Sequence, residues 1–86
     1  MKLNRNFISR ISDDESILVS GGGAEFSGIV KGNRTFGVIL ELLKKETSEA
    51  DLISAMKGRF EAPEGMIEKD VARVLSELRR IGALDE

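Results

Sequence analysis

The spacing of the apolar residues changes near Asn33, and this change constrains the fold more than any other feature of the sequence. Before Asn33, apolar residues lie in short runs that polar residues and glycines interrupt. After Asn33, they recur every three or four positions, which is the period of an amphipathic helix. The sequence therefore predicts strands in the first third of the chain and helices in the rest.

Three short strands are expected within residues 7–31. Phe7–Ile11 is rich in residues that favour strands, and a polar turn separates it from the more buried run Ser16–Ser20. The third strand is expected at Glu25–Lys31, and such short connections predict an antiparallel meander. Alternate residues of the third strand face opposite ways, with Phe26, Gly28 and Val30 on one face and Ser27, Ile29 and Lys31 on the other.

Three helices are expected near residues 33–45, 48–60 and 64–81, with ends uncertain by ~2–4 residues. Each carries an apolar stripe at helical spacing, and Val38 and Leu42 widen the stripe of the first helix until it nearly encircles the helix. The stripes are Phe36, Ile39, Leu40 and Leu43, then Leu52, Ile53, Met56 and Phe60, then Ile67, Val71, Val74, Leu75, Leu78 and Ile81.

Residues at the helix ends support these boundaries. Asn33 and Ser48 are expected to cap the first two helices, because their side chains can accept a backbone N–H. Gly82 lies where a left-handed residue would end the third helix. Lys44–Lys45 are expected in the last turn of the first helix, where positive charge suits the helix dipole.

Strands followed by helices predict an α+β fold in which residues 1–86 form a single domain. The helices must cover one face of the three-stranded sheet. The sheet has two edges, and an edge strand exposes unpaired backbone groups. An edge is therefore the feature that we expect to carry function.

The residue types present argue against catalysis. The chain has no histidine and no cysteine, so it lacks the commonest general base near neutral pH and the usual metal ligands. The carboxylates of Asp13–Glu15 and Asp85–Glu86 lie in a turn and near the end of the sequence, where water solvates them. Gly21–Gly23 joins two strands and no Gly-Lys-Ser follows, which disfavours a phosphate loop. We expect no catalytic residue, metal or cofactor.

Charge and hydropathy restrict the kinds of partner and the cellular location that we expect for the protein. The formal net charge is −2, which weighs against a protein that coats nucleic acid. No stretch approaches the ~20 apolar residues that cross a bilayer. A cytoplasmic protein without membrane contact is the expectation.

One side of the third helix carries a polar row roughly opposite the apolar stripe. At 100° per residue, Lys69, Arg73, Ser76 and Arg80 share this side. Acidic residues are interleaved with them, so two interpretations have equal weight: a solvated face with ion pairs, or a face that contacts a peptide.

The chain resembles the PqqD family over nearly its whole length. The family pattern has a strand leading into Leu-Asn, a helix with Ile-Trp-x-Leu-Leu, a Thr after a break, an aromatic residue and a Gly-Leu-Leu ending. The matching positions are Val30–Asn33, Ile39–Leu43, Thr47, Phe60, Asp70-Val71, Val74-Leu75, Leu78 and Gly82–Leu84. Gly32 stands where the family has Leu, Leu40 where it has Trp, and Lys44-Lys45 where it has Asp-Gly.

The resemblance implies a winged helix-turn-helix-like domain that recognises the leader segment of a ribosomally synthesised precursor peptide. Such domains bind the leader as a strand on the third β-strand, against the third helix. They bring the leader to a modifying enzyme, often a radical S-adenosylmethionine protein. The residues expected to contact the peptide are Phe26, Ser27, Gly28, Ile29, Val30, Lys31, Lys69, Ala72, Arg73 and Ser76.

Several points stay open at the level of sequence. Gly28 either permits close approach of the peptide backbone or satisfies a local turn. The leader is expected to contact one of two flanks beside the apolar stripe of the third helix: Glu68, Ala72 and Arg79, or Asp70, Arg73 and Glu77. Arg73, with Lys69 above it, is favoured because the resemblance implies an acidic leader and a guanidinium can bind a carboxylate through two hydrogen bonds. The alternative functions are a winged-helix DNA-binding regulator and a dimerisation or scaffold module, and both a monomer and a homodimer fit the sequence.

Overall fold

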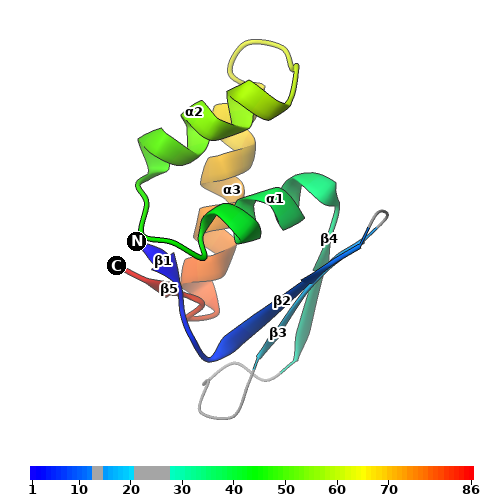
Figure 1. Ribbon diagram of the computed structural model, residues 1–86, viewed down its shortest axis with the longest axis vertical. Coiled ribbons are helices and arrows are strands. Elements are labelled where there is room, and N and C mark those ends of the chain that lie inside the picture. The colour runs from blue at the N-terminus through cyan, green and yellow to red at the C-terminus, as the bar shows by residue number, and fades with distance from the viewer. Residues whose placement is uncertain (13–14, 21–27) are drawn as a thin grey trace.

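A three-stranded sheet forms one layer and the helices lie on one side of it (Figure 1). The computed structural model describes residues 1–12, 15–20 and 28–86. Within these ranges, β2 (Phe7–Ile11), β3 (Ser16–Ser20) and β4 (Ile29–Gly32) form an antiparallel sheet in the order β2-β3-β4. The helices α1 (Arg34–Leu42), α2 (Glu49–Arg59) and α3 (Met66–Arg80) follow. The α+β, winged helix-turn-helix-like order expected from the sequence is confirmed.

The two faces of the sheet differ in burial as period-two alternation requires. Leu18 of β3 pairs with Val30 of β4, and Leu18 is buried beneath the helices. On the other face, Ile8, Val19 and Ile29 form one row across the three strands. Ile8 and Ile29 are 57% and 60% exposed, so no described element covers this row.

The third strand of the sheet differs from the expectation. The sequence predicts Glu25–Lys31, whereas β4 spans Ile29–Gly32 and so continues one residue further. Phe26 and Ser27 lie outside the residues that the structure describes. Gly28 immediately precedes the strand with a φ of 147°, a conformation that residues with a Cβ rarely adopt. Of the two explanations for glycine at position 28, this φ favours a local turn over close approach of a peptide backbone.

The helix caps lie where the sequence places them. The N–H of Phe36 donates to Asn33 Oδ1 at 3.0 Å, and the N–H of Asp51 donates to Ser48 Oγ at 3.1 Å. Gly82 has a φ of +76° at the end of α3. These side chains and this glycine satisfy backbone groups that a helix end leaves unpaired.

The placement of Lys44–Lys45 in the last turn of the first helix is wrong. Helix α1 ends at Leu42, so both lysines follow it. The C=O of Leu43 accepts the N–H of Leu3 at 2.8 Å. The carbonyl of Leu43, the C-cap of α1, therefore has a partner elsewhere in the fold in place of a further helical turn.

That partner belongs to a second, smaller sheet that the sequence did not predict. β1 (Lys2–Leu3) pairs antiparallel with β5 (Leu84–Asp85). The N–H of Asn4 also donates to the C=O of Ala83 at 2.7 Å. Two-residue strands carry no readable periodicity, because alternation needs at least four residues.

The core lies between the sheet and the three described helices. Most of the stripe residues expected from the sequence are buried; the exceptions are half-buried and pack against the core, namely Val38, Leu42, Ile53 and Phe60. The remaining core residues come from the sheet and the ends of the helices. The buried apolar set is Phe7, Leu18, Phe36, Ile39, Leu40, Leu43, Leu52, Met56, Ile67, Val71, Val74, Leu75, Leu78, Ile81 and Ala83.

Candidate functional site

The outer edge of β4 presents unpaired backbone groups. The N–H of Ser20 donates to the C=O of Gly28 at 3.3 Å. In an antiparallel pair of strands, every second residue of a strand directs its N–H and C=O groups toward the partner strand, and the residues between direct theirs away from it. Gly28, Val30 and Gly32 therefore direct their N–H and C=O groups toward β3. Ile29 and Lys31 direct theirs away from it, to an edge that no described segment pairs with.

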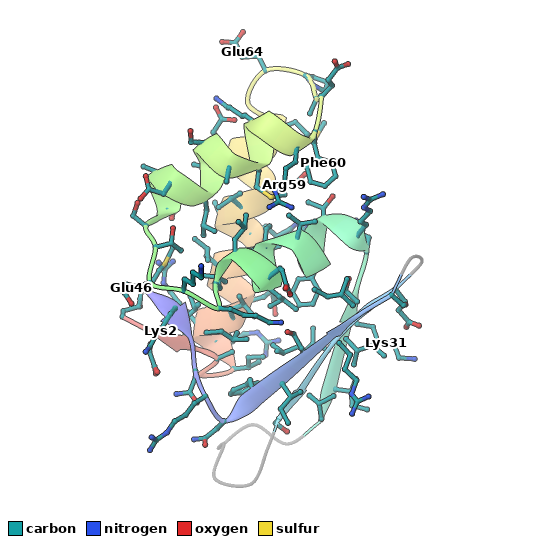
Figure 2. The ribbon with its side chains drawn as sticks, in the orientation of Figure 1. Lys2, Lys31, Glu46, Arg59, Phe60 and Glu64 are labelled. Atoms are coloured by element: carbon teal, nitrogen blue, oxygen red, sulfur yellow. The ribbon has the colours of Figure 1, made fainter. Side chains whose placement is uncertain are left out.

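A groove of about 330 Å³ runs between this edge and α3. Figure 2 labels Lys31, which lies on the β4 side of the groove. One wall comes from β4 and the start of α1, and the other from one flank of α3. We call it the β4 groove; it is lined by Val30, Lys31, Gly32, Asn33, Phe36, Arg73, Val74 and Glu77.

The β4 groove combines an apolar base with charged rims. Phe36 and Val74 are buried core residues that reach its surface. The charged groups are held by exposed ion pairs: Arg73 lies 3.9 Å from Asp70, and Lys31 lies 3.7 Å from Glu15. Exposed pairs of this kind contribute little to stability, so a ligand can displace them at small cost. The groove can take an extended peptide whose alternate side chains are apolar and charged.

Gly32 and Phe36 shape the end of the groove together. A Cβ at position 32 would lie 2.5 Å from Cγ and 2.7 Å from Cβ of Phe36. Both distances are far inside van der Waals contact, and the Phe36 ring is itself packed in the core. The ring therefore occupies the space that the leucine of the resembling family would need, which accounts for a glycine here.

The structure brings one of the two candidate flanks of α3 to β4. Arg73 and Glu77 line the groove. On the other flank, Glu68 pairs with Lys57 of α2 at 3.1 Å and Arg79 pairs with Glu86 at 2.9 Å. Those two residues therefore face α2 and the end of the chain.

The pKa directions agree with these contacts. A backbone hydrogen bond at Glu68, assisted by the side chain of Lys57, holds the pKa of Glu68 below its usual value. The hydrogen bond between Arg79 and Glu86 raises the pKa of Arg79 and lowers that of Glu86. These charges are engaged in structural pairs on the flank that does not face β4.

The expected site residues do not all come together: Phe26 and Ser27 lie outside the described residues, and Gly28 immediately precedes β4. Val30, Lys31 and Arg73 meet in the β4 groove, and Ile29 lies on the edge strand beside it. Lys69, Ala72 and Ser76 are exposed on α3 but do not line the groove. The helical wheel placed Lys69 and Ser76 on the polar side of α3 and Ala72 on the flank with Glu68 and Arg79, whereas the groove meets the flank that carries Arg73 and Glu77.

Several groove residues were not among the site residues expected from the sequence. Phe36 and Val74 match core positions, so periodicity assigned them to the interior. Glu77 belonged to one of the two candidate flanks, and Gly32 and Asn33 were interpreted as a strand break and a helix cap. A helical wheel gives the direction of each side chain around the helix axis. It does not show which part of the helix surface the neighbouring elements leave uncovered.

Neither a metal site nor a membrane span is found in the described part of the chain. No group of three or more acidic side chains there is close enough to hold a metal ion. No helix within residues 1–12, 15–20 and 28–86 is long and apolar enough to cross a membrane.

Comparison with known proteins places this geometry in a family. The model for coenzyme PQQ synthesis protein D (PqqD) matches residues 15–84. No curated protein matches the sequence at a significant level. Two solved structures share the fold at low identity.

One of these structures is TbiB1 in complex with the TbiA(beta) leader peptide. Its TM-score is 0.79 at 19% identity, over 99% of this chain and 95% of that chain. The other is lasso peptide synthetase B1 complexed with the leader peptide, with a TM-score of 0.71 at 21% identity over 95% and 93% of the two chains. The family match runs from the start of β3 into β5 and includes every element of the β4 groove. This chain belongs to the PqqD family.

Proposed function

We propose that this chain binds the leader segment of a ribosomally synthesised precursor peptide as an added strand on β4. The leader runs antiparallel to β4, and its inward side chains enter the β4 groove. The observation that carries the proposal is the outward direction of the Ile29 and Lys31 backbone groups beside that groove. Strand addition draws affinity from such main-chain groups, and side-chain pockets supply selectivity.

The comparisons support the same function. The chain is a PqqD family member, and both structural neighbours are described as complexes with leader peptides. The protein acts as an adaptor: it catalyses no step itself and presents the leader to a modifying enzyme. We propose a radical S-adenosylmethionine enzyme as this partner, because the family resemblance implies one.

A DNA-binding role has less support from the arrangement of charge. Arg80 bonds Glu77 at 2.7 Å, Arg79 bonds Glu86 and Arg73 lies near Asp70. Each arginine of α3 therefore has an acidic neighbour. A helix that reads DNA needs a dense positive field with few opposing acids.

The test is a pair of substitutions at one position. Ile29→Pro removes the outward N–H without removing a bond to β3, whereas Ile29→Ala removes the side chain and keeps the N–H. Losing this bond and leaving a leader carbonyl unpaired costs roughly 1–3 kcal/mol, which corresponds to roughly 5- to 150-fold in Kd. Titration calorimetry with the cognate leader peptide measures both variants.

Circular dichroism establishes that each variant is folded before it is titrated. We expect the proline variant to bind markedly more weakly than the alanine variant. If folded Ile29→Pro binds the leader as tightly as wild type, strand addition at β4 is wrong.

A further inference from the structure

The sheet has a second free edge, on β2. Because the N–H of Ser20 bonds to Gly28 of β4, Ser20 does not bond to Phe7, which lies opposite it on β2. Alternation then directs the backbone groups of Phe7, Ser9 and Ile11 away from β3. The N–H of Phe7 is already bonded to the C=O of Asn4 at 3.0 Å. Ser9 and Ile11 keep N–H and C=O groups on an edge that no described segment pairs with.

Two hollows meet along this edge. One, of about 440 Å³, is lined by Lys2, Leu3, Asn4, Arg5, Phe7, Ile8, Ser9, Lys44 and Asp85. The other, of about 360 Å³, is lined by Ser9, Ile11, Val38, Glu41, Lys44 and Arg59. Ser9 and Lys44 line both, so the two hollows adjoin, and we call them together the β2 groove. Like the β4 groove, it combines a free strand edge with a helix, in this case α1.

The β2 groove is basic in a chain whose net charge is −2. Its basic side chains are Lys2, Arg5, Lys44 and Arg59, against the acids Glu41 and Asp85. Figure 2 labels Lys2 and Arg59, which lie at the β1 and α2 ends of the groove. The four basic side chains outnumber the two acids, so the groove has a net positive charge.

Glu41 lies 2.9 Å from Lys44 in an ion pair, and Asp85 Oδ1 accepts a hydrogen bond from Asn4 Nδ2 at 2.7 Å. The groove therefore combines backbone donors on the strand edge with a positive field. An extended segment with carboxylate side chains matches both features.

We propose that an extended acidic segment of the modifying enzyme adds as a strand to β2 and lies in the β2 groove. This inference rests on the proposed function. A leader on β4 leaves β2 free, because the two edges lie on opposite sides of the sheet, about 10 Å apart at the strand spacing of a sheet. The leader and the enzyme segment can then be bound at the same time, and each adds one strand to an edge of the three-stranded sheet.

A second copy of this chain is a poorer occupant of the β2 groove. Pairing β2 with β2 across a two-fold axis would bring two sets of the same basic residues together. Like charges that face each other across an interface disfavour association. The charge of the groove therefore selects an acidic partner over a homodimer.

The test uses two capped model peptides, Glu-Val-Glu-Val-Glu-Val and Lys-Val-Lys-Val-Lys-Val, with ¹⁵N-labelled full chain observed by NMR. We expect the acidic peptide to shift the amides of Ser9 and Ile11 in a saturable way, and the basic peptide to leave them unchanged. Raising the salt to about 0.5 M should weaken binding, because the groove charges are exposed. Shifts confined to Ile29 and Lys31, or no shifts at all, would overturn the proposal.

Substitutions distinguish a loss of binding caused by the changed charge from one caused by a disturbed fold. Arg59→Glu should weaken binding of the acidic peptide by roughly three- to tenfold, as expected for reversing one exposed charge. Lys69→Glu makes the same charge change outside both grooves and should have little effect; equal losses in the two variants would refute a site in the β2 groove. Ser9→Pro removes an outward N–H and should weaken binding further if the variant stays folded.

Titration with the cognate leader keeps this inference distinct from the proposed function. If the acidic peptide fails to bind while the leader still shifts Ile29 and Lys31, only the β2 proposal fails. If the acidic peptide binds equally well to protein saturated with leader, the two edges act independently, as we propose.

Discussion

Substituting Gly37 with alanine tests how closely α1 packs on the sheet. An ideal Cβ at this position would overlap Ser16 Oγ and lie 3.0 Å from Ser16 Cβ and 3.3 Å from Ile11 Cγ2. Ser16 is fully buried, and its hydroxyl has no hydrogen-bond partner among the described residues. The hydroxyl can rotate away, but Ser16 Cβ is fixed to β3, so α1 and the sheet would have to separate by a few tenths of an ångström.

The expected magnitude is a balance of two opposing effects. Alanine in place of glycine inside a helix gains about 1 kcal/mol of propensity. Overpacking a well-packed core costs about 1–3 kcal/mol. We therefore expect Gly37→Ala to lower the free energy of unfolding by up to about 2 kcal/mol, although alanine is the better helix former.

Gly58 of α2 provides the matched control. A Cβ there meets nothing within 4 Å, so Gly58→Ala should raise stability by about 0.5–1 kcal/mol. Urea unfolding followed by circular dichroism measures both variants. A Ser16→Gly background removes both Ser16 contacts and leaves the 3.3 Å contact with Ile11 Cγ2, an exposed side chain that can shift, so Gly37→Ala should become neutral or stabilising there. A Gly37→Ala protein that is stabilised as much as Gly58→Ala would refute the reasoning.

The remaining predictions concern the core and the β4 groove. Leu40 and Leu75 are fully buried, so replacing either by alanine should cost roughly 2–5 kcal/mol by urea denaturation; midpoints equal to wild type would contradict the assigned core. Arg73→Glu should weaken leader binding less than Ile29→Pro does, because a rim charge contributes less than a desolvated backbone bond, and the loss should shrink as salt rises. Lys69→Glu is the control in calorimetry, since it lies outside the groove; a loss equal to that of Arg73→Glu would shift the site toward the polar side of α3.

Local patterns determined much of the architecture. The β2 strand was predicted at its observed residues, Phe7–Ile11, and the stripe from Ile67 to Ile81 was predicted to be buried along α3. Asn33 and Ser48 were predicted as caps for a reason that involves only their own helices. These features depend on residues a few positions apart, so the chemistry that causes them is visible in the sequence.

Contacts between distant segments decided what local patterns could not. Helix α1 ends before Lys44 and the C=O of Leu43 bonds instead to Leu3, some forty positions away, and β1 exists only because β5 folds back beside it. Among the peptide-contact candidates, Arg73 lines the β4 groove while Lys69, Ala72 and Ser76 do not.

The sequence alone determined the order of the three-stranded sheet and the three helices, the apolar face of each helix and the absence of histidine and cysteine chemistry. It also left two edges on the predicted sheet. Only the tertiary structure decided which flank of α3 meets β4, because a helix can turn about its axis by a small angle without changing its apolar pattern. Packing against α1 and α2 sets that rotation, and with it the side chains that line each free edge.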